Sequence, residues 1–128
     1  MDPSLRAFGW GILLINTKIT LKTGGVFKTK PVKGLKSQSD IENILAIVSF
    51  IKALIKTHKI KIAHFEIPFG SKSSRAAQAL SLVEGAVLAT LVTQGTEIHP
   101  WLPQEIKQSL TGNPYAEKED VLTQVRQQ

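Results

Sequence analysis

In the stretch MDPSLRAFGWGILLIN (residues 1–16), a carboxylate and a turn stand directly before an apolar run. The segment GWGILLIN (residues 9–16) predicts a buried β-strand, and Asp2 lies a few residues ahead of it. A charged side chain at this point does not fill a core, because burying an unpaired charge is costly. Asp2 therefore marks either an exposed, frayed chain end or the edge of a functional site.

The segments that follow predict alternating strands and helices. ITLKTGGVFKT (residues 19–29) has a period of two and predicts one or two strands, interrupted at Gly24-Gly25. KIKIAHFEI (residues 59–67) predicts a strand that ends near Glu66, and TEIH (residues 96–99) predicts a short strand that ends at the next proline. The order β-β-β-α-β-α-β-α-α indicates an α/β fold, in which an antiparallel meander and then alternating helices and strands form a mixed sheet flanked by helices.

Four helices complete this prediction. The first has Ser37 or Ser39 as its N-cap and Asp40 and Glu42 in its first turn. Its expected apolar face consists of Ile41, Ile44, Leu45, Val48, Ile51 and Ile55. A second long helix begins after an N-cap at Ser73 and ends at Gly95, a short helix begins at Pro103, and a last helix occupies residues 116–128.

The composition limits the class of protein. With 128 residues, of which 42% are hydrophobic, the chain predicts a single domain with its own core over residues 1–128. It has no cysteine, which excludes disulfides and zinc–thiolate sites and is compatible with a reducing cytoplasm. No apolar run reaches the roughly 18 residues that cross a membrane, and Asp2 stands where a signal peptide carries positive charge. We therefore expect a cytoplasmic protein without a membrane partner.

The positive charge is concentrated at one end of the chain. The net charge is +6, and residues 1–36 hold seven Lys or Arg residues against one acidic residue. Residues 37–128 hold nine of each, so the excess lies in the first third of the chain. Such a basic region is typical of a protein that binds a polyanion such as nucleic acid. The alternative is a solvated, lysine-rich hairpin that only aids solubility.

Two carboxylates stand at predicted strand ends, where open α/β sheets place their ligands. They are Asp2, before the first strand, and Glu66, which ends the strand KIAHFE (residues 61–66). Taken alone, Glu66 has the simpler interpretation of a capping or edge residue. None of the three histidines has metal-ligand spacing, so His58, His64 and His99 are interpreted as structural, although His64 shares a strand face with Glu66.

Three separated segments resemble the RuvC-type Holliday junction resolvases, which have a ribonuclease H-like fold. They are DPSLRAFGWG (residues 2–11), FEIPFGSKSSRAAQALSLVEGAVLATL (residues 65–91) and LPQEIKQSLTGNPYAEKEDVLTQV (residues 102–125). The resemblance implies a structure-specific endodeoxyribonuclease that cleaves four-way or branched DNA in recombination and repair. It also implies that Asp2 and Glu66 are metal ligands, for which Mg²⁺ is the expected ion and Mn²⁺ a substitute, because Mg²⁺ prefers hard oxygen ligands.

Further residues are expected to contact DNA. The resemblance assigns catalytic lysines near the scissile phosphate to Lys107 and Lys118 and a base-stacking aromatic to Phe69, which has core packing as its alternative. Lys72 and Arg75 stand at the start of a predicted helix, where a phosphate is favoured. Lysines of the basic region are expected to bind duplex arms; these include Lys28, Lys30 and Lys33.

The second long helix predicts a homodimer. Its small residues (Ala76, Ala77, Ala79, Gly85, Ala86 and Ala89) allow close packing on a twofold mate, and the resolvase family is dimeric. The alternative is that this face packs only on the sheet of its own chain.

The chain departs from the resolvase pattern at both ends. The family has an apolar strand before its first Asp and a final helix with an acidic pair, whereas only Met1 precedes Asp2 here and no matching pair follows. The chain is then a fragment of an enzyme, a homologue that binds junctions without cutting them, or an enzyme that recruits acids from elsewhere. A two-carboxylate site holds Mg²⁺ weakly, which predicts poor cleavage by this chain alone. A ribonuclease H-like protein with another task is disfavoured, because no Gly-rich phosphate cradle follows beyond GWG (residues 9–11).

Overall fold

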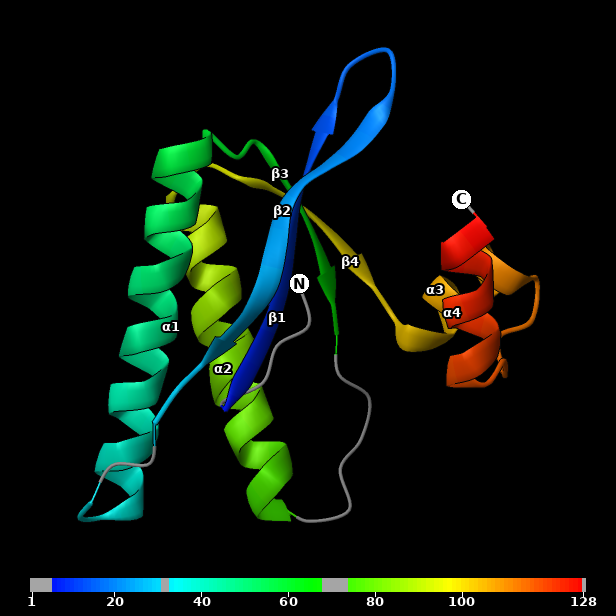
Figure 1. Ribbon diagram of the computed structural model, residues 1–128. Helices are drawn as coiled ribbons and strands as arrows, with labels where there is room; N and C mark the ends of the chain where they lie inside the picture. Colours follow the sequence, from blue (N-terminus) through cyan, green and yellow to red (C-terminus); the bar gives the residue numbers. More distant parts are fainter. Residues whose placement is uncertain (1–5, 31–32, 68–73, 128) are drawn as a thin grey trace.

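The computed structural model describes residues 6–30, 33–67 and 74–127. Its elements are β1 (Ala7–Ile15), β2 (Ile19–Lys28), α1 (Lys36–His58), β3 (Ile62–Glu66), α2 (Ser74–Thr93), β4 (Glu97–Trp101), α3 (Pro103–Thr111) and α4 (Lys118–Gln127). Helices α1 and α2 lie side by side on one side of the strands, and α3 and α4 lie together on the other (Figure 1). The expected α/β architecture is confirmed.

Strands β1 and β2 form an antiparallel hairpin. It is paired from Ala7↔Lys28 to Ile15↔Ile19, with a register shift between Ile12 and Leu13. The interruption expected at Gly24-Gly25 is wrong, because β2 runs through both glycines as one strand. A Cβ on Gly24 would lie 3.0 Å from the carbonyl oxygen of Trp10, so glycine permits close approach of the two strands here.

The first strand is buried only in part. Phe8 and Ile12 are 0% and 7% exposed, whereas Leu13, Leu14 and Ile15 are 55%, 50% and 67% exposed. The prediction of a strand buried along its whole length is therefore wrong. The reason is geometric, because the hairpin extends beyond the helices that cover its base (Figure 1).

Strands β3 and β4 form a parallel pair, and α2 is the crossover between them. The register runs from Ile62↔Glu97 to Glu66↔Trp101. Strand β4 continues through Pro100, two residues beyond its expected end at His99. Proline has no N–H to donate, so it is tolerated in a short strand at the edge of a sheet.

Both strand pairs pack on the same helical layer. Phe8 from β1 and Phe65 from β3 are each 0% exposed and meet side chains of α1 and α2. The helical part of this core consists of Ile47, Ile51, Ile55, Val83, Val87 and Leu91. Phe27 extends the core toward the hairpin by stacking on Phe50, with ring centroids 4.4 Å apart. The pairs are thus held over one layer, although in the described residues they form separate two-stranded sheets.

Helix α1 differs from its prediction at its start and on its buried face. It begins at Lys36 after Leu35, which makes no side-chain capping bond, so Ser37 and Ser39 lie inside the helix rather than at its N-cap. The expected apolar residues Ile41 and Leu45 are 57% and 59% exposed. The helix has more apolar residues than one face holds, and the buried stripe runs instead through Ser39, Asp40, Asn43, Ile47, Ile51 and Ile55.

The other helices begin and end close to their predicted positions, although the N-cap predicted at Ser73 lies outside the described residues. Gly95, which follows α2, has φ +75°, and Pro103 is the first residue of α3. The N–H of Leu102 donates to Glu105 Oε2 at 2.8 Å and so caps α3. Helix α4 begins at Lys118 rather than at residue 116, since Ala116 is buried (3% exposed) as part of the preceding turn.

Residues Arg75–Thr93 of α2 are long and apolar enough to cross a membrane by length and composition. One such helix is weak evidence for a membrane span, because core helices also pass this test; 22% of this stretch is buried, and Val83, Val87 and Leu91 lie in the core.

Candidate functional site

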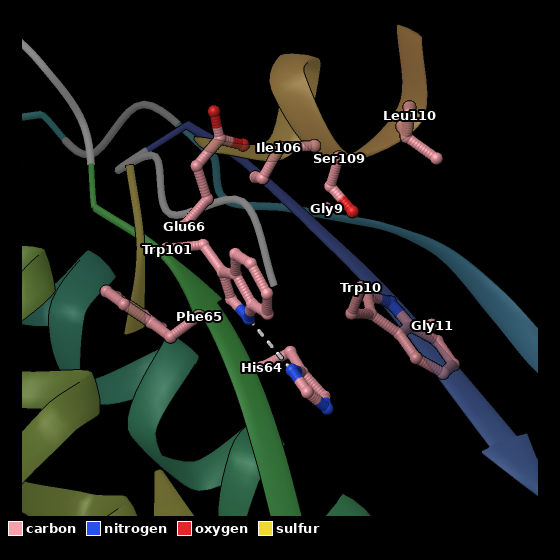
Figure 2. Close-up of a pocket in the computed structure, with 10 residues that line it drawn as sticks. All are labelled: Gly9, Trp10, Gly11, His64, Phe65, Glu66, Trp101, Ile106, Ser109 and Leu110. Carbon is pink, nitrogen blue, oxygen red and sulfur yellow. Dashed lines mark hydrogen bonds between the residues drawn. The ribbon is translucent and has the colours of Figure 1, made fainter. Parts of the chain in front are cut away.

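A cleft of about 470 Å³ lies between β1, the ends of β3 and β4, and α3. Figure 2 shows the side chains around it, with Trp10 on β1 across from the β3 and β4 residues. Its lining residues are Gly9, Trp10, Gly11, His64, Phe65, Glu66, Trp101, Ile106, Ser109 and Leu110. Most of these side chains are apolar or aromatic. The acidic side chain of the lining is that of Glu66.

Glu66 is the last residue of β3, as the sequence predicts. Side chains alternate along a strand, so Glu66 and His64 share the cleft face of β3 while Phe65 and Ala63 face the core. Phe65 projects away from the cleft residues, toward the helices (Figure 2). The fully buried Phe65 ring therefore anchors the backbone that carries both polar side chains.

Trp101 fixes the ring of His64. Its Nε1–H donates to His64 Nδ1 at 2.9 Å, across the pair of parallel strands (Figure 2). A neutral imidazole that accepts through Nδ1 carries its proton on Nε2, so this bond selects one tautomer of His64. His64 has a partner of the kind expected for a structural histidine, and it also lines the cleft beside Glu66, so its expected structural role stays a prediction.

The other two histidines also have structural positions. His58 ends α1, and His99 Nε2 lies 2.9 Å from Glu97 Oε1. The rings of His99 and His64 are 5.1 Å apart, so the histidines of β3 and β4 are neighbours on one face.

Trp101 is a cleft residue that the sequence prediction missed. It lies opposite Glu66 in the parallel register, which joins segments 35 positions apart (Glu66↔Trp101). The sequence signal that could have found Trp101 was the strand predicted at residues 96–99, because extending that strand by two residues reaches Trp101.

The two lysines predicted as catalytic lie on helices α3 and α4. Lys107 is partly exposed on α3, next to the cleft residue Ile106, and Lys118 is exposed at the first position of α4. The lysines of the basic region lie elsewhere. Lys28 ends β2, and it is exposed, as are Lys30 and Lys33 in the segment leading to α1.

Arg75 is paired with an acidic residue. Its Nη2 donates to Asp40 Oδ2 and so joins the first turn of α2 to the second turn of α1. Asp40 and Glu42 were expected in the first turn of their helix, which is wrong, because α1 begins at Lys36 and its first turn holds no acidic residue. Asp40 is instead 5% exposed and belongs to the buried stripe of α1. The pair is a long-range contact for which the local pattern of either helix gives no signal.

Several predicted residues lie outside the described part of the chain; they are Asp2, Phe69 and Lys72. Among residues 6–30, 33–67 and 74–127, no group of three or more His, Cys, Asp or Glu side chains is arranged to hold a metal ion. Glu66 alone does not define a cation site. The described residues therefore do not by themselves fit a divalent cation.

Comparisons with known proteins agree with this geometry. The family model described as "Crossover junction endodeoxyribonuclease RuvC" matches residues 1–128. A protein of that name from Ehrlichia canis (strain Jake) is 30% identical over 121 residues, covering 94% of this chain and 74% of the relative. Another, from Solidesulfovibrio magneticus, is 32% identical and covers 94% of this chain and 69% of the relative.

Solved structures show the same fold. "T. thermophilus RuvC in complex with Holliday junction substrate" superposes with a TM-score of 0.83 at 26% identity, over 98% of this chain and 74% of that one. "Thermus thermophilus RuvC structure" gives a TM-score of 0.81 at 25% identity, over 98% and 75%. The protein thus has the ribonuclease H-like fold of these nucleases. More narrowly, the chain belongs to the crossover junction endodeoxyribonuclease RuvC family.

Proposed function

We propose that this protein is a structure-specific endodeoxyribonuclease that resolves four-way or branched DNA by hydrolysing phosphodiester bonds, on DNA in the cytoplasm, during recombination and repair. The observation that carries the proposal is the position of Glu66. This carboxylate ends β3 at the rim of a cleft, in a chain that the resolvase family model matches from end to end. The neighbouring Phe65 buries its ring in the core and so fixes the backbone at Glu66, as a catalytic carboxylate requires.

The proposed cofactor is Mg²⁺, with Mn²⁺ as a substitute, and the proposed ligands are Glu66 and Asp2. A carboxylate oxygen is a hard ligand of the kind that Mg²⁺ prefers. The described residues support only the part played by Glu66, since Asp2 lies outside them.

The proposed DNA contacts lie on two parts of the molecule. Lys107 and Lys118, on α3 and α4, are proposed to act at the phosphate that is cut, since α3 forms one wall of the cleft. The exposed lysines at the base of the hairpin are proposed to hold duplex arms. These are Lys28, Lys30 and Lys33. Phe69, Lys72 and Arg75, from the segment between β3 and α2 and the start of α2, are proposed to contact the crossover.

A homodimer is proposed through α2. One face of α2 packs in the core, and the opposite face is apolar and exposed. Leu82 and Val92 on that outer face are 49% and 65% exposed, and Gly85 and Ala89 between them are also exposed. A Cβ on Gly85 meets nothing within 4 Å, so the chain itself does not require a glycine there. Small residues between larger apolar ones let a second helix approach closely, which supports a twofold mate on this face.

A second candidate is a homologue that binds branched DNA without cutting it. The lack of a three-donor metal group among the described residues favours this candidate. The two candidates differ in one measurable way, since a binder holds the junction in chelator and cuts nothing when divalent cations are present.

The experiment is a junction assay with the chain and its Glu66→Gln variant. A labelled, immobile four-way junction is incubated in Mg²⁺, Mn²⁺ or chelator and run on native and denaturing gels. Symmetric nicks that Glu66→Gln abolishes support the nuclease. Glu42→Gln, at an exposed position of α1, is the control and leaves the nicks unchanged. A shifted junction with no nick in any condition supports the binder instead, and the absence of any shift contradicts both.

A further inference from the structure

We propose that Asp40 is a positioning residue, which holds the Arg75 guanidinium at the start of α2 in the orientation that a DNA phosphate requires. This inference rests on the proposed junction binding and names a second, buried residue behind that surface. It comes from a carboxylate to which the proposed chemistry gives no role. Asp40 is 5% exposed and does not line the cleft, and its carboxylate is ion-paired with Arg75.

The two partners differ in burial. The Asp40 side chain is 7% exposed, whereas the Arg75 side chain is 49% exposed. Asp40 lies between two further buried polar residues of α1, Ser39 and Asn43. A carboxylate at such a place is strongly unfavourable without a cation, so the pair holds Arg75 more tightly than a surface ion pair does.

The geometry of arginine leaves Arg75 able to bind a second anion. The bond to Asp40 runs through Nη2, and a guanidinium has five N–H donors in a rigid, planar fork. With Nη2 held on a buried carboxylate oxygen, fewer orientations are open to the fork. Since half of the side chain is exposed, the fork is accessible to a phosphate from solvent.

The position of Arg75 also indicates a need for support. It is the second residue of α2, where the helix dipole disfavours a cation. The starts of α1 and α2 lie at the same end of the molecule, the end toward which strand β3 runs (Figure 1). Asp40 thus compensates for an otherwise unfavourable cation in the first turn of α2.

The test compares junction affinity across a salt series for Asp40→Asn and for the charge-reversed double variant Asp40→Arg with Arg75→Asp. Removing an acidic charge strengthens binding to a polyanion if only net charge matters. Positioning predicts the opposite, that Asp40→Asn binds about three- to tenfold more weakly. The double variant restores an ion pair and has a higher melting temperature than Asp40→Asn. It loses about tenfold in affinity, and its salt dependence falls by about one released counterion.

A third variant keeps the test decisive if the first two fold poorly. Arg75→Lys keeps the charge and loses the planar fork, and it is expected to weaken binding about three- to tenfold, whereas Arg126→Lys on α4 leaves the affinity unchanged. The positioning role is overturned if the wild-type chain binds the junction and Asp40→Asn or the double variant binds as tightly. If the wild-type chain does not bind the junction at all, the proposed function fails and this inference fails with it.

Discussion

Replacing Phe65 with alanine is expected to lower the free energy of unfolding by about 3–5 kcal/mol. Phe65 is 0% exposed in the centre of β3, between the cleft residues His64 and Glu66. A buried phenylalanine removes about 200 Å² from water, which at about 25 cal/mol per Å² corresponds to roughly 5 kcal/mol before subtracting the share that alanine keeps. Because single domains have a total stability of about 5–15 kcal/mol, the variant is expected to lose a large part of it.

Urea denaturation followed by tryptophan fluorescence measures this loss, since Trp10 and Trp101 lie on either side of the cleft. Tyr115→Ala is the control, because Tyr115 is 79% exposed and its removal is expected to change stability by less than about 0.5 kcal/mol. A loss below about 1 kcal/mol for Phe65→Ala, with an unchanged denaturant slope, would show that Phe65 is not part of a packed core.

Three further substitutions test separate features. Gly95→Ala is expected to cost about 1 kcal/mol because Gly95 has φ +75°. Gly85→Ala, at a position of α2 that is exposed in the monomer, is expected to raise the stability of the monomer by up to about 1 kcal/mol; urea denaturation of the monomer that gives the reverse order refutes this. Trp101→Phe removes the donor to His64 and is expected to let the Nδ1–H tautomer form, which nitrogen NMR shifts detect; an unchanged tautomer refutes it. Leu82→Glu is expected to convert a dimer to a monomer in sedimentation, unlike the same change at an exposed leucine of α4; a dimer that persists contradicts the α2 interface.

Local signals were sufficient for the elements that position Glu66. Period-two alternation and the proline after Ile67 predict the strand and its end, and both are confirmed. Gly95 and Pro103 likewise mark a helix end and a helix start, because their backbone preferences act within a few residues. The acidic residue of the cleft was therefore predictable from the sequence.

Features that depend on distant segments were not predictable in the same way. The pairing of Asp40 with Arg75 joins positions 35 apart, and no periodicity within α1 distinguishes a buried carboxylate from a solvated one. The buried face of α1 was predicted wrongly at Ile41 and Leu45 for a related reason, since two apolar stripes compete and only the neighbouring elements decide between them. Gly24 is a further example, because the close approach of Trp10 comes from the opposite strand.

The parallel register of β3 and β4 also has a consequence for synthesis on the ribosome. The β1–β2 hairpin closes through residues 16–18 and has its partner as soon as it emerges, whereas Glu66 pairs with Trp101. At roughly 5–20 residues per second, the partner strand follows about 2–7 s later. Pulsed hydrogen exchange on stalled chains is expected to find the hairpin protected first, and the reverse order would contradict this. During that interval the strand that carries Glu66 has no strand partner, and until α2 is made Phe65 and Ala63 lack part of their core packing.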